Sequence, residues 1–121
     1  MRDEIDDADL LRADSLAREI FSDLANKWAL LIIAVLDERT LRFSELHTMV
    51  DGISHKMLTQ NLRMMERNGL VHRTVHPTVP PRVEYALTPA GRALLVTVEA
   101  MCDWTHAHLH AIEASRHRFD A

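Results

Sequence analysis

The sequence has few of the residues on which several protein classes depend. One cysteine in 121 residues excludes a disulfide framework, so we expect the protein to lie in the cytoplasm. Three glycines, four prolines and 5% aromatic residues are too few for an all-β protein, which needs many turns. No glycine-rich phosphate loop, nucleophile elbow or pair of carboxylates stands out, so we expect neither an enzyme nor a cofactor.

Long apolar runs are also missing. The longest, WALLIIAVL at residues 28–36, is too short to cross a bilayer, and the acidic start of the chain is unlike a signal or transit peptide. We therefore expect no membrane contact. With 47% hydrophobic and 26% charged residues, the chain is typical of a globular protein with one domain. We expect a flexible acidic segment at residues 1–14 and a single domain at residues 15–121.

Positive charge is scarce overall but concentrated in one region. The formal net charge is −4, and residues 1–23 carry three arginines against eight acids. Residues 52–82 instead carry five lysines and arginines against Glu66 alone. Binding to nucleic-acid phosphates needs such a local basic surface, whatever the net charge of the chain.

The first half of the chain predicts short helices. Apolar residues at i,i+4 spacing indicate an amphipathic helix from about Ser15, and WALLIIAVLDE reads as a buried helix that stops near Glu38. The residues TLRF at 40–43 are short and extended. Ser44 is then a plausible N-cap for a short helix, ELHTMV, which Asp51-Gly52 follows as a turn.

The stretch GISHKMLTQNLRMME at residues 52–66 predicts a helix with two different faces. Ser54 caps its beginning and Asn68-Gly69 ends it. At 100° per residue, Leu58, Leu62 and Met65 form one apolar stripe. The opposite arc is polar and mostly basic: Lys56, Thr59, Gln60, Arg63 and Arg67.

Alternating patterns after this helix predict a β-hairpin over residues 71–87, with the proline-containing tip HPTVPP. Thr88-Pro89 then begins a final helix, expected to run to about Ala114. Two helices joined by a tight turn and followed by a hairpin are typical of a winged helix-turn-helix. The fold class is therefore mainly α with a small β-hairpin, and its long C-terminal helix is expected to mediate dimerisation.

The polar face of helix 54–68 suits the major groove of double-stranded DNA, which displays acceptors for Arg or Lys and a donor-acceptor pair for Gln or Asn. A solvated surface helix is the alternative. Because Glu66 is the only acid in the stretch and a hairpin follows, we favour DNA. The expected contacts are made by Ser54, His55, Lys56, Thr59, Gln60 and Arg63. Of these, we assign Gln60 and Arg63 to base edges and Lys56 to the backbone.

Two further arginines have two interpretations each. Arg82 follows Pro80-Pro81 at the hairpin tip, where it either enters the minor groove or touches phosphate, or pairs with Glu84 on the same strand face. Arg42, on the short strand, either reaches a backbone phosphate or stays solvated.

Several ordered motifs carry a family resemblance. The segments KWALLIIAVLDERTLRFSEL, GISHKMLTQNLRMMERNGLVHR and VPPRVEYALTPAGRAL resemble the HxlR-type winged helix-turn-helix regulators, which are related to the MarR group. The resemblance covers roughly residues 15–104. It implies a dimeric bacterial transcription factor that binds operator DNA, with helix 54–68 in the major groove and hairpin 71–87 as the wing.

The sequence departs from this family at its redox switch. Many redox-sensing members carry a cysteine about a dozen residues before the Lys-Trp pair, where this chain has Ser15. Serine forms neither a thiolate nor a disulfide. Cys102, the only thiol, is either a small buried apolar residue or a sensor acting across a dimer interface. Control by a small-molecule effector between the first and last helices, or by expression level alone, is expected instead.

Two other hypotheses compete with these. His106 and His110 lie one helical turn apart, with Glu113, Cys102 and Asp103 nearby, but two histidines are too few for a closed metal site. We expect an exposed polar face there and no bound metal.

The alternative function is a winged helix that docks a partner protein, with an incidental basic face.

Overall fold

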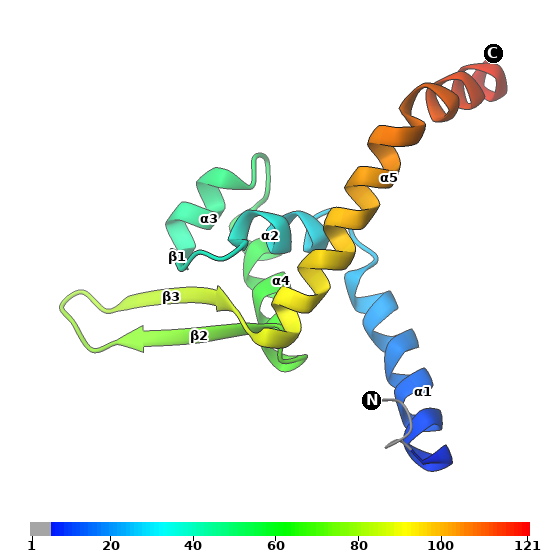
Figure 1. The fold of residues 1–121 in the computed structure, drawn as a ribbon. Helices are drawn as coiled ribbons and strands as arrows, with labels where there is room; N and C mark the ends of the chain where they lie inside the picture. Colours follow the sequence, from blue (N-terminus) through cyan, green and yellow to red (C-terminus); the bar gives the residue numbers. More distant parts are fainter. Residues whose placement is uncertain (1–5) are drawn as a thin grey trace.

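The computed structural model describes residues 6–121, which form five helices and three strands (Figure 1). In chain order these are α1 (Asp7–Leu24), α2 (Ala29–Leu36), β1 (Leu41–Arg42), α3 (Phe43–Met49), α4 (His55–Arg67), β2 (Val71–His76), β3 (Arg82–Leu87) and α5 (Pro89–Asp120). The predicted fold class is confirmed. A mainly helical winged helix-turn-helix carries a small sheet and a long C-terminal helix.

The three strands form an antiparallel sheet in the order β1-β3-β2. β2 and β3 pair without a bulge from Val71 opposite Leu87 to His76 opposite Arg82. β1 adds one short edge, with Leu41 opposite Tyr85. The hairpin therefore projects from the helices as an arm, as predicted for residues 71–87, and its loop at 77–81 is the far end of that arm (Figure 1).

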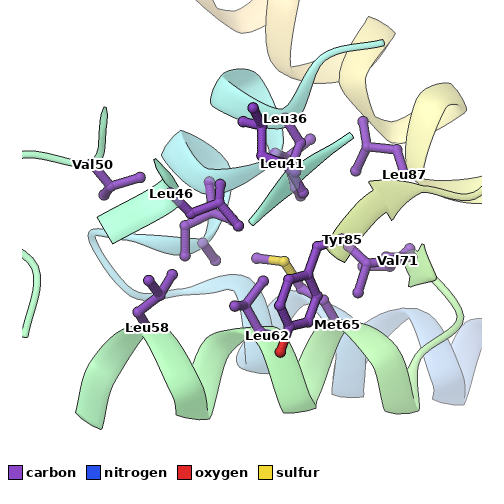
Figure 2. Close-up of a cluster of buried hydrophobic side chains, with 14 of the residues drawn as sticks. Leu36, Leu41, Leu46, Val50, Leu58, Leu62, Met65, Val71, Tyr85 and Leu87 are labelled. Carbon is purple, nitrogen blue, oxygen red and sulfur yellow. The ribbon is translucent and has the colours of Figure 1, made fainter. Parts of the chain in front are cut away.

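The core lies between α2, α3, α4 and the base of the hairpin. α4 contributes Leu58, Leu62 and Met65, each at most 1% exposed, and these side chains point toward Tyr85 and Leu46 (Figure 2). Full burial of a leucine side chain contributes about 1.5–3 kcal/mol. This stripe therefore fixes how α4 is rotated, and with that rotation which residues it turns outward.

The start of α5 is held against the residues that follow α4 by hydrogen bonds and close packing. The Thr88 hydroxyl accepts from the Gly91 N–H (3.0 Å) as the predicted cap and donates to the Gly69 carbonyl (2.5 Å). Gly91 packs so tightly that a Cβ there would lie 2.1 Å from the Leu70 carbonyl oxygen. This close approach requires glycine, and it sets the direction in which α5 leaves the domain.

α1 and the far half of α5 extend away from the domain (Figure 1). In α5 the buried residues end at Val98, whereas α1 buries only Leu24. Large apolar side chains are nevertheless exposed on both helices: Leu10, Leu11, Leu16, Phe21, Val96, Met101, Trp104, Leu109 and Phe119. Over residues 6–121, no helix combines the length and the apolar character needed to cross a bilayer.

Four predicted helix boundaries are corrected. α1 begins at Asp7 and not at Ser15, because the Asp6 side chain accepts from the Asp9 N–H (2.8 Å) and caps the helix. Part of the segment expected to be flexible is thus helical, while residues 1–5 lie outside the described residues. α2 ends at Leu36, two residues before the expected stop.

The other two corrections concern α5 and α3. α5 continues to Asp120, past the expected end at Ala114. Ser44 is not an N-cap, because α3 begins at Phe43, two residues before the predicted start at Glu45. Arg42 stands at the cap position instead, and its backbone N–H donates to the Glu45 carboxylate (2.8 Å).

Candidate nucleic-acid interface

Capping at both ends defines α4, as the sequence predicts. The Ser54 hydroxyl accepts from the Met57 N–H at 3.1 Å. At the other end Gly69, with a φ of 71°, donates to the Glu66 carbonyl (3.0 Å), and the Leu70 N–H donates to the Met65 carbonyl (2.8 Å). This pair of bonds is a Schellman motif, for which glycine suits the left-handed residue. The helix therefore has a fixed length and an N-terminus open to solvent.

The outward face of α4 holds the residues predicted to bind DNA. All six of them on and before this helix are exposed: Ser54, His55, Lys56, Thr59, Gln60 and Arg63. The one buried polar side chain of α4, Asn61, is satisfied within the helix, because its Nδ2 donates to the Met57 carbonyl (2.9 Å). The polar surface of α4 is thus presented outward by a packed apolar back.

A stack of rings joins α3 to the start of α4. The His47 and His55 rings lie 4.0 Å apart between centroids, and Phe43 lies 5.5 Å from His55. These contacts connect the two helices of the helix-turn-helix at the N-terminal end of α4. His55 is thus part of this contact as well as a surface residue. No sequence pattern marks His47, because a contact between two helices leaves no local signal.

Gln60 and Arg63 lie on different flanks of the exposed face. Arg63 and Thr59 line a cleft of about 350 Å³ that also contains Arg73 of β2. Gln60 lies on the other flank, where Asp23 and Asn26 are also found. Arg73 was not predicted as a site residue. It belongs to a separate element, and only the packing of the hairpin against α4 brings it beside Arg63.

The two predicted site arginines outside α4 line one groove. Arg42 and Arg82 border a groove of about 560 Å³ between β1, the start of α3 and the hairpin loop, together with Phe43, Ser44 and residues 78–83. The Arg82 Nε lies 4.0 Å from Glu84 Oε1, so the predicted proximity to Glu84 is present. The Arg82 side chain is still 40% exposed.

The side chains considered for sensing lie elsewhere, on the far half of α5. Cys102 is exposed, as are His106 and His110. His110 Nδ1 lies 3.9 Å from Glu113 Oε1. Within residues 6–121, no three histidine, cysteine or acidic side chains are grouped so that they would hold a metal ion.

Comparison with known proteins identifies the family. The model of the HxlR-like helix-turn-helix family matches residues 23–113, three quarters of the chain. The chain belongs to the HxlR-like helix-turn-helix family. The HTH-type transcriptional regulator YtfH of Escherichia coli (strain K12) is 36% identical over 113 residues, which cover 93% of this chain and 90% of that protein.

Solved structures agree with this HxlR assignment. Transcriptional regulator YtfH from Salmonella typhimurium has a TM-score of 0.74 and 39% identity, covering 84% of this chain and 90% of the other. The redox regulator HypR in its reduced form also has a TM-score of 0.74, with 33% identity and coverage of 81% and 97%. This HxlR-type protein is therefore a DNA-binding transcriptional regulator and not an enzyme.

Proposed function

We propose that this HxlR-type protein binds operator DNA in the cytoplasm as a homodimer, with α4 in the major groove and hairpin 71–87 as the wing. One observation carries the proposal. The inward stripe of α4 is fully buried, while its opposite face exposes Lys56, Gln60 and Arg63 on a helix of 13 residues. The major groove admits a single helix, and bases are read there by side chains of these types.

The exposed apolar faces of α1 and α5 support a homodimer. One winged helix reads few base pairs, so two copies related by a twofold axis gain specificity by reading two half-sites. Met101 and Trp104 on α5, and Phe21 on α1, are more than half exposed in the single chain. Pairing α1 and α5 with those of a second copy would remove this apolar surface from water.

The residues around α4 divide into base-reading and phosphate-binding groups. Gln60 and Arg63, in the middle of α4, are assigned to base edges. Lys56 on α4, Arg42 on β1 and Arg82 on the wing are assigned to the backbone. Ser54, His55 and Thr59 line the rest of the same contact. This division follows from position, because the central turns of a recognition helix lie deepest in the groove.

Selective binding to one duplex tests the function. We expect the protein to retain a duplex from the region upstream of its own gene against an excess of mixed-sequence competitor, with affinity that falls steeply as salt rises. Competition titrations at three salt concentrations measure both properties. A winged helix that docks only a partner protein would show no such preference, and that result would contradict the proposal.

Oxidation is expected to leave DNA binding unchanged, because the position of the family's sensing cysteine holds Ser15. Cys102 is exposed on α5, far along the chain from α4 and from the wing. Treatment with diamide or peroxide should change operator affinity by less than twofold, and Cys102→Ser should bind normally. Titration before and after oxidation, with the serine variant as control, measures this. Control is instead proposed to come from a small-molecule effector between α1 and α5, or from expression level alone. A tenfold loss of affinity on oxidation that the serine variant lacks would contradict this and identify Cys102 as a sensor.

A further inference from the structure

One face of the sheet carries a single carboxylate among several cationic or basic side chains. Glu84 on β3 lies directly opposite Arg42 on β1. Residues opposite each other in an antiparallel pair share a face, and so do residues two apart on one strand. Glu84 therefore shares its face with Arg42 and Arg82, and also with His76, which lies opposite Arg82. Among residues 71–87 Glu84 is the only acid.

One oxygen of that carboxylate forms a hydrogen bond with one neighbour and only a longer charge contact with another. The His76 Nε2–H donates a hydrogen bond to Glu84 Oε1. The Arg82 Nε lies 4.0 Å from the same oxygen, which is beyond hydrogen-bond distance. This Nε is buried and has no hydrogen-bond partner among the described residues. Glu84 thus attracts Arg82 by charge, while its hydrogen bond goes to His76.

We infer that His76 is a positioning residue that keeps Glu84 from capturing Arg82, and so leaves the Arg82 guanidinium available to a DNA backbone phosphate. The inference deepens the proposed function and rests on it, because it needs the wing to contact DNA. Arg82 lines the groove that it shares with Arg42, and 40% of its side chain is open to solvent. A phosphate entering that groove would bind the exposed part of the Arg82 side chain, while the buried Nε would stay beside Glu84.

The physical reason is that the Glu84 carboxylate and a DNA phosphate compete for the guanidinium of Arg82. Arginine and carboxylate groups form two parallel charge-assisted hydrogen bonds where their geometry allows, and this arrangement is stronger than a single neutral hydrogen bond. Without His76, the Glu84 carboxylate is free to turn toward Arg82, two residues away on the same face. DNA would then have to break that pair before it gained the phosphate contact.

Four variants of the full chain, titrated with the same operator duplex over a range of salt, test the inference. His76→Ala should weaken binding roughly three- to tenfold, about the value of one hydrogen bond. It should also reduce the slope of log affinity against log salt concentration by about one unit, the effect of one lost phosphate contact. Arg82→Ala should reduce the slope by the same amount. His76→Gln keeps an N–H donor for Glu84 and should bind like wild type. His76→Ala combined with Glu84→Gln should also regain wild-type affinity, because a neutral amide does not capture Arg82.

Three results would overturn the inference: wild-type binding by His76→Ala, a double variant as weak as His76→Ala, or the same loss in His76→Gln as in His76→Ala. The last two results would indicate a purely structural effect on the wing. The controls separate this inference from the function itself. If wild type prefers its operator but Arg82→Ala binds equally well, only the role of the wing fails. If wild type prefers no duplex, the proposed function fails.

Discussion

Replacing Arg63 by alanine is expected to cost roughly 1–3 kcal/mol on the cognate operator and to relax the preference for one base pair, as expected for loss of a bidentate base contact. Gln60→Ala should have an effect of the same size at a different position. Arg63 lies on the flank of α4 that faces the wing, and Gln60 lies on the other flank. Binding to a set of duplexes with single base changes measures both effects.

Lys56→Ala is the matched control, since it removes an exposed cation from the same helix. It should weaken binding to all duplexes similarly and flatten the salt dependence by about one unit. None of these side chains belongs to the core, so the variants should fold normally. If Gln60→Ala and Arg63→Ala both leave affinity and base preference unchanged, the assignment of α4 as the recognition helix is wrong.

Placing a charge on the exposed apolar stripe of α5 is expected to abolish dimerisation. Met101 is 54% exposed and lies beyond Val98, the last buried residue of α5. Met101→Glu should therefore spare the folded domain, while burying its carboxylate in an interface would be costly. Joining two half-site contacts raises affinity by about 10²–10⁴-fold. A monomeric variant should lose operator affinity on the order of 100-fold.

His110→Glu provides the control for this dimerisation test. It adds a similar charge to α5 nine residues farther along, which places it about 180° around the helix. The His110 variant should keep the mass of a dimer, and Met101→Glu should have the mass of a monomer at micromolar concentration. Wild-type protein that stays monomeric even with operator present would contradict the homodimer itself.

Local signals were enough to predict most of the elements. A cap and a left-handed glycine act within a few residues, so Ser54 and Gly69 marked both ends of α4 correctly. Apolar stripes act over one helix, so the buried face of α4 and the side it turns outward also followed from periodicity. The predicted starts of α1 and α3 were wrong, because several neighbouring residues could cap each of these helices. The side chain of Asp6 starts α1 early, and α3 begins at Phe43 without a side-chain cap of the usual kind.

The sequence by itself determined that this protein is a winged helix-turn-helix with one helix whose exposed face is basic, because caps, periodicity and charge are properties of neighbouring residues. Only the tertiary structure decided which distant side chains meet. Arg73 lies in the same cleft as Arg63 because β2 packs on α4. His76 bonds to the Glu84 oxygen that lies near Arg82, because strand register places the three residues on one face. Such contacts depend on how elements pack and align, and no stretch of one element specifies them.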